Sequence, residues 1–251
     1  MHYNLISILL IFNIIFSDSN IEKYLWPTDA SETITTVFGD RRSKRFHAGI
    51  DVRTYGNIGD DLYAIESGYI SRISINPTGY GKALYLKLED GNTAVYAHID
   101  KYENKIRSFI ENYKKKNDIN FFDIYLKKND IKVNKGDIIG FAGDTGSLSG
   151  GHLHFEIRNI DGHPINPLEK YYEVKDTKKP IPTSIAFIPI DSSCYIDGLQ
   201  KYMFYDLFKH DSLNYVLKDT ISVIGNFGLG LEVDDEVDNQ PFSYGIFNIK
   251  A

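Results

Sequence analysis

The chain has 251 residues, of which 42% are apolar and 25% are charged, and its formal net charge is −6. This composition is typical of a globular protein with room for one large domain or two modest ones. Its basic residues form no long run, which argues against a nucleic-acid-binding groove because such grooves need clustered Lys and Arg. The single cysteine, Cys194, excludes an internal disulfide.

The N-terminus has the pattern of a secretory signal peptide. Leu5 to Phe16 form a mostly apolar run, shorter than the about 20 residues that a membrane span needs. Ser17 and Ser19 are small residues suited to a cleavage point, and no cysteine follows to carry a lipid anchor. An uncleaved anchor or a buried first helix is the alternative. We expect residues 1–19 to be a signal peptide and the protein to be exported to the periplasm or cell envelope.

From Thr33 onward, short runs of alternating apolar and polar residues predict β-strands. Glycine-bearing turns separate these runs, and Asp90-Gly91 predicts a tight hairpin. The predicted strands are LYAI (62–65), YISRISI (69–75), ALYLKLE (83–89), TAVYAHI (93–99), parts of IKVNKGDIIGFAG (131–143) and HLHFEIR (152–158). The first domain is therefore expected to be mainly β.

Residues 100–116 interrupt this pattern with a helical one. Five apolar residues fall on one helical face, namely Tyr102, Ile106, Phe109, Ile110 and Tyr113. Asp100 and Glu103 are spaced to cap the start of the helix. We interpret the segment as a helical insertion, which either forms one wall of a substrate groove or is a surface helix without a functional role.

The segment 175–183 has the composition of a linker, because it is charged and then carries two prolines. Beyond it, SIAFIPI (184–190) and TISVIGNFGLGLEV (220–233) predict a second β-rich domain over 184–251. The chain ends on SYGIFNIKA, which reads as a strand. We therefore expect the second domain to be β-sandwich-like and incomplete.

Histidines in three motifs are candidate site residues. FHAGID holds His47 and Asp51 four residues apart, so both can contact one metal ion if the chain turns at Gly49. A single motif of this kind occurs often by chance. YAHID adds His98 after the predicted hairpin, where an isolated histidine is more often structural.

GGHLHFEIRN (150–159) places His152 and His154 on the same face of a strand, because strand residues two apart point the same way. The preceding glycines allow close approach of a backbone or a ligand. His47, Asp51 and one of this pair would supply two nitrogens and one oxygen, the ligand set of a catalytic zinc site. Such a site keeps one position for water, whose pKa zinc lowers to about 7.

The order of these motifs resembles that of the lysostaphin/LytM-type zinc metallopeptidases, which are peptidoglycan endopeptidases. The resemblance covers about Val37 to Leu168 and includes FGDRRSKRFHAGIDVR, LYAIESGYISRI, GYGKALYLKL, GNTAVYAHI, VNKGDIIGFAGDTGSLSGGHLHFEIR and HPINPL. It implies a compact antiparallel β core, similar to a barrel-sandwich hybrid, over a catalytic domain of residues 20–174. Where many relatives have Asn-Thr-Gly, this chain has Asp144-Thr145-Gly146.

The resemblance also implies a role for each histidine motif. His47, Asp51 and His154 would bind one Zn²⁺ per chain, and His98 and His152 would act as general base and transition-state stabiliser. Glu156, in the same row as the histidines of its strand, is expected either to support a ligand from behind or to form a salt bridge on the sheet. His163 is expected in a turn and His210 on the surface.

The implied function is zinc-dependent hydrolysis of peptide cross-links in bacterial peptidoglycan. One alternative is a non-catalytic member of the same family that binds the wall or activates a hydrolase. Another is a phosphocarrier, because VNKGDIIG and its flanking hairpins also resemble lipoyl, biotinyl and sugar-phosphotransferase carrier domains. The peptide stems or cross-links of peptidoglycan are the expected partner, and neither nucleic acid nor an integral membrane domain is expected.

Overall fold

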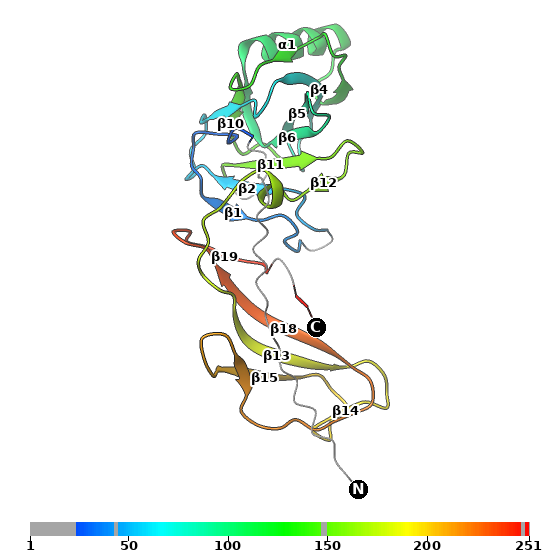
Figure 1. The fold of residues 1–251 in the computed structure, drawn as a ribbon. Coiled ribbons are helices and arrows are strands. Elements are labelled where there is room, and N and C mark those ends of the chain that lie inside the picture. Colours follow the sequence, from blue (N-terminus) through cyan, green and yellow to red (C-terminus); the bar gives the residue numbers. More distant parts are fainter. Residues whose placement is uncertain (1–23, 43–44, 147–149, 247–248, 251) are drawn as a thin grey trace. The chain divides into compact units, whose positions relative to one another are not determined.

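The computed structural model describes residues 24–42, 45–146, 150–246 and 249–250. The chain divides into two compact units, the first of which ends at Lys175 and the second of which begins at Asp176 (Figure 1). The expected signal peptide, residues 1–19, lies outside the described residues. Within the described part of the chain, no helix has the length and apolar character needed to span a membrane.

A nine-stranded antiparallel sheet is the scaffold of the first unit. Its strands lie in the order β1-β2-β11-β6-β5-β4-β8, with β12 beside β11 and β9 beside β4. The strands are β1 Ile34–Thr36, β2 Ile50–Arg53, β4 Gly68–Ile75, β5 Lys82–Leu88, β6 Thr93–Ala97, β8 Phe122–Tyr125, β9 Lys132–Val133, β11 His152–Arg158 and β12 Pro164–Ile165. Strands β2 and β11, far apart in the sequence, are therefore neighbours.

A smaller sheet packs against this scaffold. It contains β3 Asp61–Tyr63, β10 Ile138–Ala142 and β7 Ile99–Tyr102 in that order. Tyr96, a fully buried residue of β6, donates a hydrogen bond from its hydroxyl to the carbonyl oxygen of Tyr63 (2.8 Å). Buried apolar side chains such as Leu84 and Phe155 lie on the Tyr96 side of the large sheet, and a cluster of Ala83, Tyr85, Val95 and Ala97 lies on its other face. The prediction of a mainly β, antiparallel fold is confirmed.

Strand β11 shows how the scaffold separates core residues from site residues. Phe155 is fully buried, and its ring packs edge-on against Tyr96 with the ring centroids 5.3 Å apart. Residues alternate between the two faces of a strand, so His152, His154 and Glu156 point to the face opposite Phe155. The fold thus presents these three side chains together.

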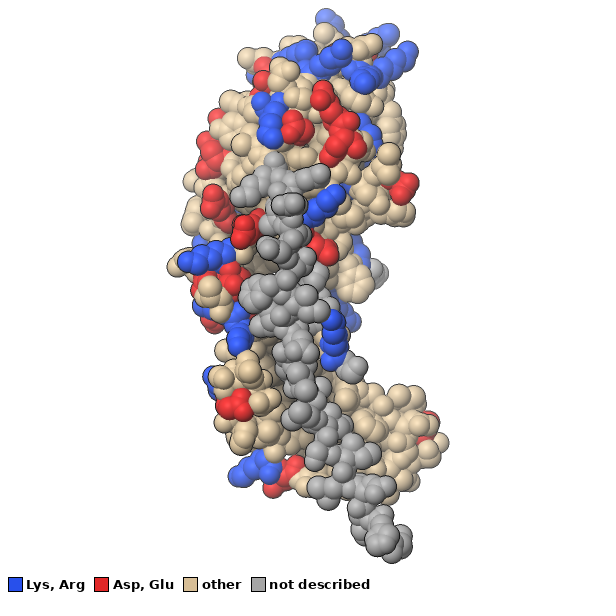
Figure 2. Space-filling view, viewed as in Figure 1, with Lys and Arg blue, Asp and Glu red and all other residues tan. Residues whose placement is uncertain are grey.

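The predicted helical insertion is confirmed, with a corrected start. Helix α1, Asn104–Asn117, buries Ile106 and Ile110. Its N-cap is Glu103, whose carboxylate accepts a hydrogen bond from the backbone N–H of Lys105. Asp100, the other expected cap residue, lies in β7 instead. Figure 2 shows basic side chains gathered over this helix, and its last turn carries Lys114, Lys115 and Lys116.

One other local prediction needed correction. The run 93–99 was expected to be one strand, but it divides into β6 and β7 at His98, whose backbone is left-handed (φ 60°). Two short elements had no clear sequence signal, namely β8 and the one-turn helix α2, Pro167–Lys170. These differences depend on contacts between residues distant in sequence, and local periodicity does not report such contacts.

The second unit contains a five-stranded sheet, in the order β16-β15-β13-β18-β19, and a two-stranded sheet of β14 and β17. The strands are β13 Ile181–Pro189, β14 Tyr195–Ile196, β15 Met203–Lys209, β16 Tyr215–Leu217, β17 Val223–Ile224, β18 Phe227–Glu236 and β19 Ser243–Tyr244. Strand β13 begins inside the segment predicted to be a linker. The strand predicted at the chain end stops at Tyr244.

Candidate metal centre and groove

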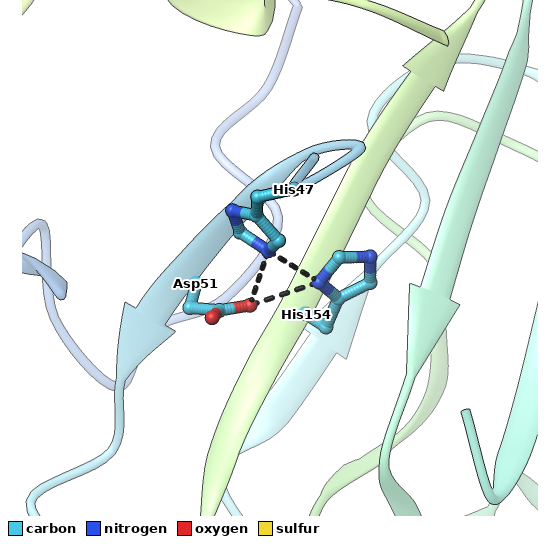
Figure 3. A group of neighbouring side chains, drawn as sticks. All are labelled: His47, Asp51 and His154. Atoms are coloured by element: carbon cyan, nitrogen blue, oxygen red, sulfur yellow. Dashed lines mark hydrogen bonds and ion pairs between the residues drawn. The ribbon is translucent and has the colours of Figure 1, made fainter. Parts of the chain in front are cut away.

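Three side chains from two distant parts of the sequence meet beside the paired strands β2 and β11 (Figure 3). Asp51 lies on β2 directly opposite His154 on β11, and His47 lies in the loop before β2. The Asp51 Oδ1 atom is 3.0 Å from His47 Nε2 and 2.8 Å from His154 Nδ1. The two imidazole nitrogens are 2.9 Å apart, and all three side chains are buried.

Gly49 allows the loop of His47 to lie close to β11. A Cβ atom at this position would be 2.1 Å from the carbonyl oxygen of Phe155, so any side chain would force the loop away from the strand. The sequence-based reason for this glycine was freedom to turn. Its φ is not positive, so close backbone approach is the actual requirement.

The protonation pattern of the two imidazoles indicates a cation site. His47 donates from Nδ1 to the Val37 carbonyl oxygen (2.8 Å), and His154 donates from Nε2 to Glu156 Oε1 (3.0 Å). Each ring therefore turns a nitrogen lone pair toward the Asp51 carboxylate. Three electron pairs without a hydrogen repel one another unless a cation lies among them. Two imidazole nitrogens and a carboxylate oxygen fit the ligand set of a catalytic zinc site.

No second group of this kind, with three metal-ligating side chains close together, occurs among the described residues. A proton on an imidazole is the alternative to a metal ion as the cation at this point. Burial raises the pKa of Asp51, but hydrogen bonds from a protonated His154 or His47 would outweigh it, and the net pKa is lowered. Burial lowers the pKa of His154, but its contacts with the Asp51 and Glu156 carboxylates outweigh it and raise that pKa to about 9. The pocket therefore favours positive charge at its centre.

Glu156 contacts the His154 ring at the nitrogen that does not face Asp51. This fully buried carboxylate accepts from His154 through Oε1 and from Arg158 Nε through Oε2 (2.7 Å), and the Tyr80 hydroxyl also donates to Oε1. Burial raises the pKa of Glu156, yet the bonds from His154 and Arg158 give a net lowering. A carboxylate that accepts from the outer nitrogen of an imidazole fixes the tautomer and orientation of that ring. Glu156 thus makes both contacts expected of it, one with a candidate ligand and one as a salt bridge to Arg158 on the sheet.

His98 and His152 form a second pair beside the cluster. Their ring centroids are 4.6 Å apart, and His152 Nε2 lies 4.0 Å from Asp51 Oδ1. Each Nδ1 donates to a backbone carbonyl, of Thr145 for His98 (2.8 Å) and of Gly150 for His152 (2.9 Å). The Nε2 atom of each ring is thus left as an acceptor. Burial lowers the pKa of His98 to about 4, so this ring is neutral at physiological pH.

The backbone of His98 is unusual. A left-handed conformation outside glycine costs about 1–3 kcal/mol and is maintained only when the surroundings hold it. Here the His98 N–H donates to the Tyr80 carbonyl (3.0 Å), and the imidazole is fixed by Thr145. This conformation ends β6 and directs the ring toward His152. The sequence carried no signal for it.

An open groove of about 1140 Å³ contains both histidine pairs. Arg42 also lines it and lies 3.0 Å from the second carboxylate oxygen of Asp51. Arg42 and Tyr80 were not recognised from the sequence, because their spacing to the histidines follows no motif. His163 and His210 are exposed and do not line the groove, as expected.

Comparisons with known proteins find similar peptidases. Residues 120–167, which include His152 and His154, match the family model described as "Peptidase family M23". The chain is 29% identical over 140 residues to the DD-carboxypeptidase/endopeptidase Mpg of Neisseria meningitidis serogroup B. It is 28% identical over 152 residues to the peptidoglycan DD-endopeptidase ShyA of Vibrio cholerae.

These alignments cover 54% and 57% of this chain, and the chain spans only 26% and 29% of the lengths of the two relatives. A crystal structure of a zinc-containing peptidase from Vibrio cholerae aligns with 58% of this chain and 38% of its own, at 27% identity and a TM-score of 0.42. Residues 120–167 thus match peptidase family M23, and about half of the chain is similar to parts of Mpg and ShyA.

Proposed function

We propose that this chain is a zinc-dependent endopeptidase that hydrolyses peptide cross-links of bacterial peptidoglycan. The first unit, which ends at Lys175, would carry the activity. The observation that carries the proposal is the convergence of three proton-free donor atoms, within 3.0 Å of one another, beside two further imidazoles in one groove.

His47, Asp51 and His154 would hold one zinc ion, because their donor atoms already face a common point. Bound zinc supplies Lewis acidity and lowers the pKa of a coordinated water from 15.7 to about 7. Glu156 would keep the His154 ring oriented, since its carboxylate accepts from the nitrogen that does not face the cluster.

His98 and His152 would move the protons. A neutral imidazole accepts a proton at Nε2 from the attacking water, and the resulting imidazolium can return it to the nitrogen of the leaving amine. The neighbouring imidazole would stabilise the oxyanion that forms on the amide carbonyl. Hydrogen bonds from both Nδ1 atoms to backbone carbonyls hold the rings in place, so little reorganisation is required.

The activities for which Mpg and ShyA are named support peptidoglycan as the substrate and the cell envelope as the place of action. A non-catalytic, wall-binding role is the alternative, and the presence of all five site residues in one groove argues against it. The exported state of the protein stays a prediction from the sequence.

The test is digestion of purified peptidoglycan by the zinc-loaded protein, with metal content measured on the same sample. We expect about one zinc per chain, release of new amino groups, loss of release after chelation and recovery on adding zinc. Zinc-loaded protein that releases no amino groups from any cross-linked peptidoglycan would overturn the proposal. If that protein still sediments with the wall, the binding alternative replaces it.

A further inference from the structure

Asp51 divides its two carboxylate oxygens between two kinds of partner. Oδ1 faces the imidazole nitrogens of His47 (3.0 Å) and His154 (2.8 Å), and both dashed lines from Asp51 in Figure 3 start at this one oxygen. Oδ2 instead accepts a hydrogen bond from Nη2 of Arg42, at 3.0 Å. The Asp51 side chain is 8% exposed and that of Arg42 is 43% exposed. A guanidinium that lines the groove therefore holds one oxygen of a buried carboxylate.

Backbone hydrogen bonds connect Arg42 to the candidate ligand His47. The Gly39 N–H donates to the His47 carbonyl oxygen (2.9 Å), and the His47 N–H donates to the Asp40 carbonyl oxygen (2.8 Å). Two residues further on, the Arg42 N–H donates to the Arg45 carbonyl oxygen (2.7 Å). These bonds pair the backbone before Arg42 with the backbone that leads into His47. The position of the guanidinium is therefore coupled to the position of the imidazole.

The partner of Oδ2 decides how many oxygens Asp51 can offer to a metal ion. A carboxylate can bind a metal ion through one oxygen or through both. In the proposed zinc site, two imidazole nitrogens and one carboxylate oxygen leave the fourth position for water. A second oxygen from Asp51 would compete with water for that position. The charge-assisted hydrogen bond from Arg42 makes it costly to turn Oδ2 toward the ion.

We infer that Arg42 is a positioning residue that restricts Asp51 to binding the metal through one oxygen and so keeps a position open for water. This inference rests on the proposed function, of which it names one control on the metal site. The guanidinium also repels a divalent cation, because both are positive and share the Asp51 carboxylate. Arg42 therefore lowers metal affinity while it keeps the water position open. Its effect is opposite in sign to that expected of Glu156, which strengthens metal binding by orienting His154.

Arg42→Met tests the inference, because methionine keeps much of the side chain's length without its charge or its donors. Zinc affinity, measured by competition with a chelator, should rise about tenfold, a difference of about 1.4 kcal/mol. Visible absorption by Co²⁺ bound in place of zinc should fall, because four-coordinate Co²⁺ absorbs more strongly than Co²⁺ with additional ligands. Arg42→Lys keeps a charged donor without the planar fork, so both readouts should lie between those of the wild type and Arg42→Met.

Arg45→Met is the matched control. Both arginines are described and line the groove, and Arg42 alone of the two forms an ion pair with Asp51. Arg45→Met removes the same charge from the groove and should keep the wild-type zinc affinity and Co²⁺ spectrum. Arg42→Gln, with the same expected changes, replaces Arg42→Met if that variant does not fold.

An unchanged Co²⁺ spectrum in Arg42→Met overturns the inference, and so does zinc binding that is no tighter than that of the wild type. The same changes in Arg45→Met would also overturn it, since they would come from the charge of the groove in general. Neither measurement requires turnover. If the wild type binds zinc and the Arg42 variants respond as expected but no peptidoglycan is cleaved, the hydrolase proposal fails and the role of Arg42 stands. A wild type that binds neither zinc nor Co²⁺ overturns both.

Discussion

The two large sheets of the molecule differ in which side chains they bury. The nine-stranded sheet buries Asp51, His154 and Glu156 among hydrogen-bond partners. The five-stranded sheet leaves apolar side chains in solvent, with Phe204 63% and Leu229 52% exposed. Both sheets consist of antiparallel strands, so strand content does not distinguish them. A sheet can hold reactive side chains in one geometry only where it buries them.

Burial holds the side chains of the first sheet's cluster in one geometry, and it also makes substitutions there costly. A buried carboxylate without partners is costly, whereas one that is fully hydrogen-bonded is held in one geometry. Glu156 has three partners, in His154, Arg158 and Tyr80. Changes inside this network should therefore have large effects, and comparable changes on the second sheet should have small ones.

The largest expected effect follows from His154→Ala. This change removes one of three ligands, so the protein should lose zinc, and activity should fall by several orders of magnitude because the attacking water regains its bulk pKa of about 15.7. Metal content and amine release measure the two losses. His163→Ala, which removes an exposed imidazole outside the groove, is the matched control and should retain both. Full zinc content in His154→Ala would contradict the ligand assignment.

His98→Asn should separate catalysis from metal binding. Asparagine tolerates the left-handed backbone of this position better than most residues, so the fold should persist. We expect normal zinc content and a kcat that is lower by a factor of about 10²–10⁴, which is the usual contribution of a general acid or base. Steady-state kinetics on a cross-linked peptide, with zinc measured in parallel, is the check. Retention of wild-type kcat would remove His98 from the mechanism.

Glu156→Gln should weaken the metal site without removing a ligand. The amide preserves shape but loses the charge that holds the His154 ring, so zinc affinity should fall by about 10–100-fold. Competition with a chromophoric chelator measures this affinity independently of activity. Glu173→Gln, at an exposed position, is the control. Unchanged affinity in Glu156→Gln would show that the contact is structural only.

Much of the first sheet could be predicted from sequence because its signals are local. Alternation along 152–158 places His152 and His154 on one face, and β11 has those bounds. The contact between Asp51 and His154 spans 103 residues, and no periodicity encodes such a pairing. That prediction came from the resemblance to a family and not from the pattern itself.

Features that depend on tertiary packing were not predictable. Asp100 is a residue type that often caps helices, but it lies in β7, which pairs with β10. The helix therefore starts after Glu103. The left-handed backbone of His98 and the reach of Tyr80 to Glu156 likewise depend on neighbours distant in sequence. Local propensity is a weak signal wherever sheet pairing competes with it.

The smallest expected effect is that of Phe204→Ala on the second sheet. Trp26, the single tryptophan, packs edge-on against Tyr172 in the first unit, so its fluorescence reports unfolding of that unit. Removing an exposed ring should change the free energy of unfolding measured in this way by less than about 0.5 kcal/mol. Phe155→Ala, the matched deletion in the core beside the cluster, should cost about 3–5 kcal/mol. A comparable cost for both variants would contradict the contrast between the two sheets.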